Sequence, residues 1–241
     1  MQEIEFEGIK IQVQRRLFQR SLNLLVKPSG QVKITSGKTT SLKHLVQFLE
    51  TQKDWLHKNV NKIRDEQNKY PRKEYVEGEQ YLFLGRKLPL VFKHHDKKRL
   101  KAQVSANSIV LFINKNLNYT KEDKRIALNK FYKASGIEVL EKVIKEKSKI
   151  MDLYPSKISY RAQKTRWGSC SSQGSLSMNW KLIFSPPESL EYVVIHELAH
   201  LQHQDHSKNF WSLVGKYSPD YKIHSDWLKQ NMYEIDSYQF K

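Results

Sequence analysis

Residues 193–200 read Val-Val-Ile-His-Glu-Leu-Ala-His, a His-Glu-x-x-His pattern inside an apolar run. The run is compatible with an α-helix, in which residues four positions apart lie on one face. The imidazoles of His196 and His200 can therefore point at one position, where they suit Zn²⁺, which binds histidine nitrogen at about 2.0–2.1 Å. Glu197 follows the first histidine directly, where this pattern has the general base that acts on a metal-bound water.

A third ligand is needed, because a catalytic zinc site usually has three protein ligands and one open position. On a straight helix, His203 would lie roughly 10 Å along the axis from His196, too far to share one tetrahedral ion. We therefore expect the helix to end soon after His200. The chain should then turn through residues 202–205, which are polar.

A second helix is expected after this turn, because Asp205 or Ser207 can accept hydrogen bonds from its free N–H groups. His206 would then lie at the start of that helix and face the first one. The sequence favours His206 as the third ligand, with His203 next and Asp205 and Asp220 as weaker acidic alternatives. The simpler alternative is a helix whose histidines form only local hydrogen bonds.

Five segments extend the pattern: Arg166-Trp167-Gly168-Ser169-Cys170-Ser171, Leu176-Ser177-Met178-Asn179-Trp180, His196-Glu197-Leu198-Ala199-His200, His206-Ser207-x-x-Phe210-Trp211 and Pro219-Asp220-Tyr221. Together they resemble the YgjP-like metallopeptidase family, and the histidine spacing is similar to that of WLM and SprT-like zincins. The likeness covers most of the chain in outline and is specific from Tyr160 to Tyr221.

This resemblance implies a zincin-like metallopeptidase with His196, His200 and His206 as zinc ligands and Glu197 as the catalytic base. It also implies a peptide or protein substrate. In zincins a sheet edge beside the metal can bind an extended peptide as an added strand. By resemblance, we assign that role to Leu176–Asn179.

Three residues of the first segment have open roles. Arg166 could bind a carboxylate or phosphate, or help to hold an oxyanion, but a structural ion pair or stacking contact is favoured. The role of Trp167 is open in the same way. Cys170 could be a fourth zinc ligand that blocks the site, but burial as a small apolar residue is favoured.

The composition is that of a globular chain of 241 residues, with 39% hydrophobic and 28% charged residues. The single cysteine excludes an intramolecular disulfide and fits a reducing compartment. The N-terminal residues lack the features of a signal peptide, and no apolar run reaches the roughly 18 residues of a membrane span. We expect a soluble, cytoplasmic protein with no membrane partner. The sequence does not set the oligomeric state.

The formal net charge is +17, which favours anionic partners and above all nucleic acid. The basic residues are densest at 93–101 and 142–149, where they could equally form solvated faces. The alternative functions are a nucleic-acid-binding protein with a structural zinc site, or a protease that acts on nucleic-acid-bound proteins. A hydrolase for a non-peptide amide is a third possibility.

The N-terminal half is predicted to be rich in strands. Apolar residues alternate over 2–37 and over 74–114, the pattern of half-buried strands. Between them, residues 39–68 carry apolar residues at helical spacing, with Thr40 or Ser41 as a cap. We find no internal repeat in the sequence.

The second half is predicted to begin with a long helix over 120–151, capped by Thr120, in which Gly136 marks a kink or a close packing contact. Two strands should follow, joined by a turn at 171–174, and Pro186-Pro187 should begin the histidine helix. We therefore predict an α+β protein. A basic β-rich domain with one helix spans residues 1–118, and a zincin-like metal-binding domain spans 119–241.

Overall fold

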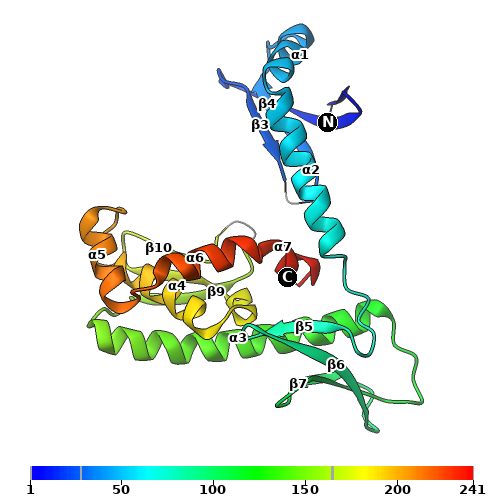
Figure 1. The fold of residues 1–241 in the computed structure, drawn as a ribbon, viewed down its shortest axis with the longest axis vertical. Helices are drawn as coiled ribbons and strands as arrows, with labels where there is room; N and C mark the ends of the chain where they lie inside the picture. Colours follow the sequence, from blue (N-terminus) through cyan, green and yellow to red (C-terminus); the bar gives the residue numbers. More distant parts are fainter. Residues whose placement is uncertain (1, 28, 164–165, 241) are drawn as a thin grey trace. The chain divides into compact units, whose positions relative to one another are not determined.

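The computed structural model describes residues 2–27, 29–163 and 166–240 (Figure 1). The chain is α+β, as predicted. It divides into two compact units, residues 1–71 and 72–241, rather than at the expected boundary between 118 and 119. The strands over 80–113 belong to the second unit because their buried residues, such as Tyr81 and Leu111, share one core with Leu128 and Leu198.

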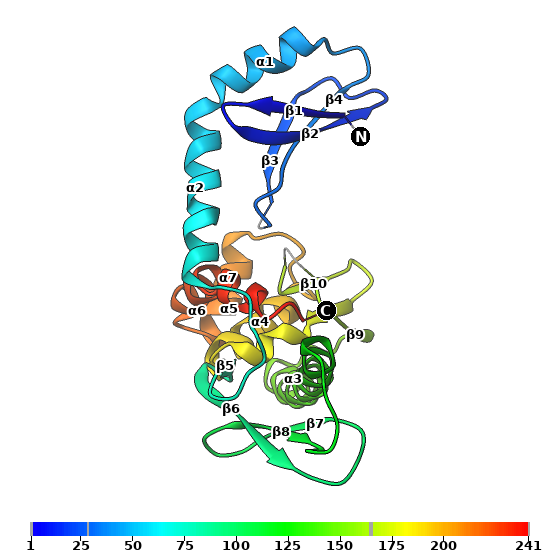
Figure 2. The ribbon, with the colours of Figure 1, turned by 90° about the vertical axis from the view of Figure 1, so that its right-hand side faces the viewer.

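The first unit holds a four-stranded sheet in the order β1-β2-β4-β3 (Figure 2). Its strands are β1 (Gln2–Phe6), β2 (Ile9–Arg16), β3 (Asn23–Val26) and β4 (Val32–Gly37). β1 and β3 run antiparallel to their neighbours, whereas β2 and β4 are parallel. Ile11 and Ile34 on the sheet pack with Leu45 and Leu49 from the following helix, which gives this unit its own core.

The single helix expected over 39–68 is two helices, α1 (Leu42–Thr51) and α2 (Lys53–Lys69). Ser41 caps the first, as predicted. The helix breaks at Gln52, where the Thr51 hydroxyl donates a hydrogen bond to the Phe48 carbonyl at 2.7 Å. Such a side-chain bond competes with the helical ladder.

The second unit begins with a sheet in the order β5-β6-β8-β7, and its helix α3 (Lys121–Met151) follows. The strands are β5 (Gln80–Phe83), β6 (Arg86–His94), β7 (Lys101–Val104) and β8 (Ile109–Ile113). Thr120 and Asp123 form a capping box at the start of α3. Gly136 marks a close packing contact between α3 and Trp180 rather than a kink, because a Cβ atom there would lie 2.4 Å from the Trp180 carbonyl oxygen.

A three-stranded sheet follows α3, in the order β10-β11-β9. Its strands are β9 (Lys157–Arg161), β10 (Gly168–Cys170) and β11 (Ser175–Asn179). β10 and β11 form the hairpin predicted at 171–174, and β9 pairs with β11 in parallel. The apolar run after β11 is a 3₁₀ helix, η1 (Trp180–Phe184), so no strand leads directly into the histidine helix.

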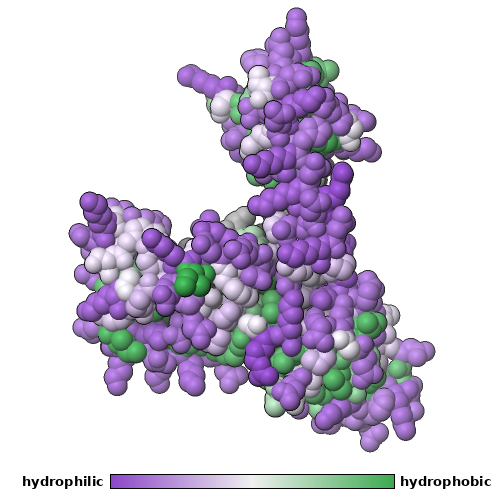
Figure 3. Space-filling view, viewed as in Figure 1, coloured by the Kyte–Doolittle hydropathy of each residue, from purple (hydrophilic) through white to green (hydrophobic). Residues whose placement is uncertain are grey.

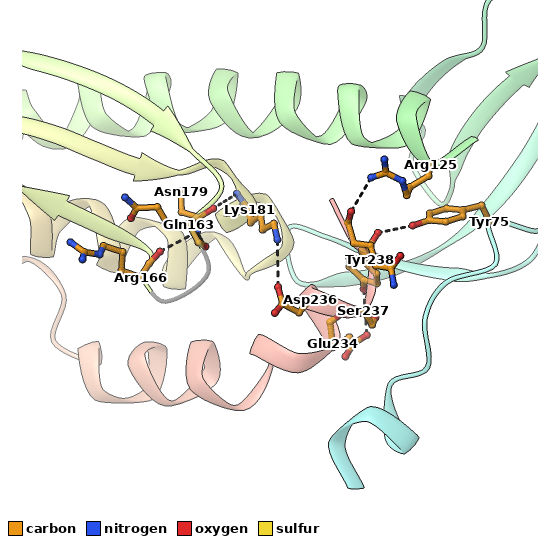
Figure 4. Close-up of polar contacts among 11 residues, drawn as sticks. Tyr75, Arg125, Gln163, Arg166, Asn179, Lys181, Glu234, Asp236, Ser237 and Tyr238 are labelled. Carbon is orange, nitrogen blue, oxygen red and sulfur yellow. Dashed lines mark hydrogen bonds and ion pairs between the residues drawn. The ribbon is translucent and has the colours of Figure 1, made fainter. Parts of the chain in front are cut away.

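Four helices complete the second unit in the described part of the chain: α4 (Pro187–Ala199), α5 (Lys208–Tyr217), α6 (Tyr221–Gln230) and α7 (Met232–Ser237). The segment after α7 returns to the core, where Tyr238 and Phe240 are buried among the rings of Tyr75, Tyr132 and Phe184. Tyr75 donates a hydrogen bond to the Tyr238 carbonyl at 2.7 Å (Figure 4).

Hydrophilic residues dominate the face drawn in Figure 3. Across the described ranges, no helix combines the length and apolar character needed to cross a membrane.

Candidate metal centre

Helix α4 starts from a firmly held position. The Leu84 amide donates to the Ile183 carbonyl at 2.7 Å, which fixes the end of η1 against the β5–β6 turn. Gly85 at this turn has φ +74, and a Cβ atom there would lie 2.9 Å from Pro186. Pro187 begins the helix, as predicted, and its missing N–H costs nothing in the first turn.

Helix α4 ends at Ala199, and the chain turns as expected. Ser207 caps α5 by accepting from the Phe210 amide at 3.5 Å, and Asp205 accepts from the Ser207 amide at 3.4 Å. These bonds set the path of residue 206. The structure thereby brings His196, His200 and His206 together, with one ligand nitrogen from each within 4.8 Å of the others.

The spacing of one pair of these nitrogens fits a zinc ion. The Nε2 atoms of His196 and His206 lie 3.2 Å apart. Two ligands of a tetrahedral ion held at about 2.0–2.1 Å are about 3.3 Å apart, so the two values agree. The centroid of the His200 ring lies 5.0 Å from that of the His196 ring and 4.8 Å from that of the His206 ring.

The protonation state of the rings also suits a metal. Burial, with smaller contributions from His200 and His206, lowers the pKa of His196 to about 4. Burial likewise lowers the pKa of His200. These two imidazoles are neutral at pH 7, and neutral imidazole is the form that binds metals.

A backbone contact orients one ring. His200 Nδ1 lies 3.0 Å from the His203 carbonyl oxygen, so Nδ1 carries the hydrogen and Nε2 is left with its lone pair. Partners of this kind fix the tautomer of metal-binding histidines. His203 therefore contributes its main chain near the site, and its side chain is outside the three-histidine group.

Aromatic rings from α5 pack around the histidines. Phe210 is fully buried, and its ring centroid lies 4.5 Å from that of His200 and 4.9 Å from that of His196. Trp211 lies 5.7 Å from His206 and stacks on Tyr221 at 4.9 Å. The sequence carried a signal for these residues, because they follow the cap of α5 at helical spacing.

Glu197 lies on α4 beside the histidines and is only 6% exposed. Burial raises the pKa of Glu197 to about 7, and the Arg166 guanidinium opposes that rise. Its Oε2 atom is buried without a hydrogen-bond partner among the described residues. A bound water or substrate group can supply that partner, since buried polar atoms are rarely left unpaired.

Gly168 on β10 is a functional position that sequence reasoning missed. A Cβ atom at Gly168 would lie 2.5 Å from Glu197 Cγ and 2.6 Å from its Oε1, so a larger residue would displace the carboxylate. The signal was present, because an isolated glycine in a strand often marks a close approach.

The main chain of Arg166 contacts Asn179 at the end of β11. The Asn179 side-chain amide donates to the carbonyls of Arg166 at 3.1 Å and Gln163 at 2.8 Å (Figure 4). The Asn179 main-chain amide donates to the Trp167 carbonyl at 2.8 Å. Asn179 therefore holds the main chain of Arg166 and Trp167 beside β11, and the Arg166 guanidinium, through its charge, opposes the rise that burial causes in the pKa of Glu197.

The other sequence candidates lie outside the histidine group as far as the chain is described. Asp205 and Asp220 are exposed. Cys170 is half-buried, and its thiol donates to the Ser171 carbonyl at 3.5 Å. Burial raises the pKa of Cys170, and the Glu197 carboxylate adds to the rise, so this side chain is a neutral thiol at pH 7 in the present arrangement.

Comparison with known proteins adds a family to this geometry. A family model described as YgjP-like, metallopeptidase domain, matches residues 20–231. No curated protein gave a match. Among solved structures, the crystal structure of the metallopeptidase zymogen of Pyrococcus abyssi abylysin is similar at 24% sequence identity, over 38% of this chain and 93% of that chain, with a TM-score of 0.36.

Proposed function

Since the chain belongs to the YgjP-like metallopeptidase family, we propose that it hydrolyses peptide bonds with a zinc ion held by His196, His200 and His206. Glu197 is the general base in this proposal. One observation carries it: three imidazole nitrogens lie within 4.8 Å of one another, beside a buried carboxylate with one oxygen that has no hydrogen-bond partner in the described part of the chain. The donor set suits zinc, which takes histidine nitrogen readily.

Zinc bound here would polarise the scissile carbonyl and make water a better acid. Glu197 then takes a proton from the attacking water and returns it to the leaving amine nitrogen. The apolar surroundings that raise its pKa favour this exchange, because a general base works best with a pKa near the working pH. The cation itself lowers that pKa again, as any nearby positive charge does.

A closed structural site is the main competing function, since it would fit a nucleic-acid-binding protein. Such a site needs a fourth protein ligand. The group in the described chain consists of three histidines, without Cys170 or an acidic residue. This favours a site with an open position, as hydrolysis requires. The net charge of +17 remains the observation that favours nucleic acid.

The substrate strand proposed from the sequence needs correction. Leu176–Asn179 corresponds to β11, which is the central strand with β10 and β9 on either side. Its main-chain groups therefore already pair on both sides and cannot bind a peptide. We assign the role to β10 instead, an edge strand whose Gly168 adjoins Glu197. An extended peptide that pairs with this edge would bring its carbonyls close to the histidines.

The base is tested by Glu197→Gln, which keeps the shape of the side chain but removes its basicity. We expect zinc content to be retained and peptide hydrolysis to fall by about 10²–10⁴-fold. Glu188→Gln is the matched control, because Glu188 lies exposed in the first turn of the same helix. Unchanged activity in zinc-loaded Glu197→Gln would end the proposal.

The ligand set is tested by measuring zinc content in two variants. His206→Ala removes a ring nitrogen and should lower the bound zinc, whereas His203→Ala should keep it. The reason is that His203 contributes its carbonyl to His200, and alanine retains a carbonyl. The reverse result would assign the third ligand to His203.

A further inference from the structure

The loop between β2 and β3 in the first unit begins with two exposed apolar side chains. Phe18 is 97% exposed and Leu17 is 64% exposed. Single exposed apolar residues are common on protein surfaces. An almost fully exposed phenylalanine next to an exposed leucine, however, is not explained by packing. We call Leu17 and Phe18 the apolar tip.

The backbone of the apolar tip is strained. Phe18 has φ +60, a left-handed conformation that bulky residues rarely adopt because Cβ crowds the following carbonyl. Glycine or asparagine would adopt it more easily. A strained residue that is also fully exposed is a reason to look for function, since nothing in its own side-chain packing requires phenylalanine.

The loop is nevertheless held in place at its base. The Gln19 carbonyl lies so close to Gly37 that a Cβ atom there would be 2.5 Å away. Arg15 donates to the Gly37 carbonyl at 3.3 Å and also to the Thr40 carbonyl. Gln19 donates to the Ser21 carbonyl at 2.8 Å. The tip is therefore a preformed projection.

The sequence around the tip is basic. From Gly8 to Leu49 the sequence has no aspartate or glutamate. It has eight basic residues in the same stretch: Lys10, Arg15, Arg16, Arg20, Lys27, Lys33, Lys38 and Lys43. Arg16 directly precedes the apolar tip, Arg20 follows it after Gln19, and both arginines are exposed. A partner that combines negative charge with an apolar layer beneath it fits these residues.

We propose that the apolar tip inserts into the headgroup region of an anionic lipid surface, with Arg16 and Arg20 on the lipid phosphates. Apolar side chains framed by basic residues bind such surfaces through both burial and charge attraction. Single-stranded nucleic acid fits less well, because it is bound by successive exposed aromatic rings. Within residues 2–27 and 29–71, the other large exposed aromatic side chain is Trp55, on α2. The sequence predicts no membrane partner because it lacks a spanning segment, and a surface contact of this kind does not need one.

The test is co-sedimentation of the full chain with phosphatidylcholine vesicles that contain or lack phosphatidylglycerol. We expect binding only with phosphatidylglycerol, and a loss of binding as salt screens the charges. Phe18→Gly should weaken this binding on the order of tenfold or more, as expected when a large apolar side chain no longer leaves water. Leu25→Ser is the matched control, because Leu25 is 54% exposed on β3 outside the tip.

Phe18→Gly also separates binding from folding, since glycine accepts φ +60 without strain. Its thermal unfolding temperature should equal or exceed that of the parent chain, so weaker binding cannot be ascribed to unfolding. Equal binding by Phe18→Gly and the parent, or equal losses in Phe18→Gly and Leu25→Ser, would overturn the proposal. So would binding of a single-stranded oligonucleotide, weakened by Phe18→Gly, in the absence of vesicle binding.

Discussion

The sheet β1-β2-β4-β3 and the sheet β5-β6-β8-β7 have the same strand order and the same strand directions. Each begins with a hairpin closed by two residues of positive φ, at 47° and 75° for Glu7 and Gly8 and at 47° and 74° for Leu84 and Gly85. Helices follow each sheet, α1 and α2 in one unit and α3 in the other. The chain thus uses one ββββα arrangement twice.

The two first turns differ in what they contact. A Cβ atom at Gly8 would meet nothing within 4 Å among the described residues, whereas one at Gly85 would lie 2.9 Å from Pro186. Glu7 forms exposed ion pairs with Lys53 and His57 of α2. Leu84 instead donates its amide to the Ile183 carbonyl. The same local turn is a surface feature in one unit and a support for the histidine helix in the other.

Removal of the metal should produce the largest difference between the units. His196, His200 and His206 all lie in the second unit, so a chelator should loosen that unit alone. A ligand present at about 1,000 times its Kd stabilises the folded state by about 4 kcal/mol. We expect faster amide hydrogen exchange in α4 and α5 after chelation, with unchanged exchange in residues 2–71. Equal loosening of both units would contradict the comparison.

Gly85→Ala should have the next largest effect. It adds left-handed strain of about 1–2 kcal/mol to an overpacking cost of about 1–3 kcal/mol against Pro186. We expect a lower free energy of unfolding of the second unit by urea denaturation, together with weaker peptidase activity as the start of α4 shifts. Gly168→Ala is a useful companion, because it displaces Glu197 directly without touching the turn.

Gly8→Ala is the matched substitution in the first unit. Its φ of +75 carries the same strain, about 1–2 kcal/mol, but no clash follows. Hydrogen exchange should rise modestly in β1 and β2, and activity should not change. If Gly8→Ala lowered the free energy of unfolding as much as Gly85→Ala does, the contact of Gly85 with Pro186 would contribute nothing to stability.

The ion pairs of Glu7 should give the smallest effect, because exposed pairs contribute little. The hydrogen bond from Lys53, followed by that from His57, lowers the pKa of Glu7 from its ordinary value of 4.5. A lowered pKa adds stability above the unfolded value and loses it as pH falls through the folded value. Glu7→Gln should therefore make the free energy of unfolding of residues 2–71 less dependent on pH in the acid range. An unchanged pH dependence would show that these pairs do not contribute to stability.

Much of the local structure was predictable from the sequence because it rests on local chemistry. The capping box of Thr120 and Asp123 and the proline start of α4 need only neighbouring residues. The proximity of His206 to His196 and His200 followed from helix geometry and the polar turn between them. The role of these residues in zinc binding stays a prediction.

The remaining features depend on contacts between distant segments. β9 pairs in parallel with β11, although β10 lies between them in the sequence. The periodicity within one strand does not reveal which strand it pairs with. The repeated sheet topology was missed because its two copies share little beyond Phe-x-Gly at 6–8 and 83–85. The break at Gln52, next to the Thr51 hydroxyl that donates to the Phe48 carbonyl, is not visible in the apolar pattern, which continues across it.

The aromatic segment after α7 has a consequence for synthesis on the ribosome. The Tyr238 hydroxyl accepts a hydrogen bond from the Leu82 amide at 3.0 Å, and Phe240 packs against Tyr132 in the interior. Leu82 and Tyr132 are synthesised more than a hundred positions earlier, so they lack these contacts until the two rings emerge. The core of the second unit is therefore complete only once residue 240 has emerged from the exit tunnel.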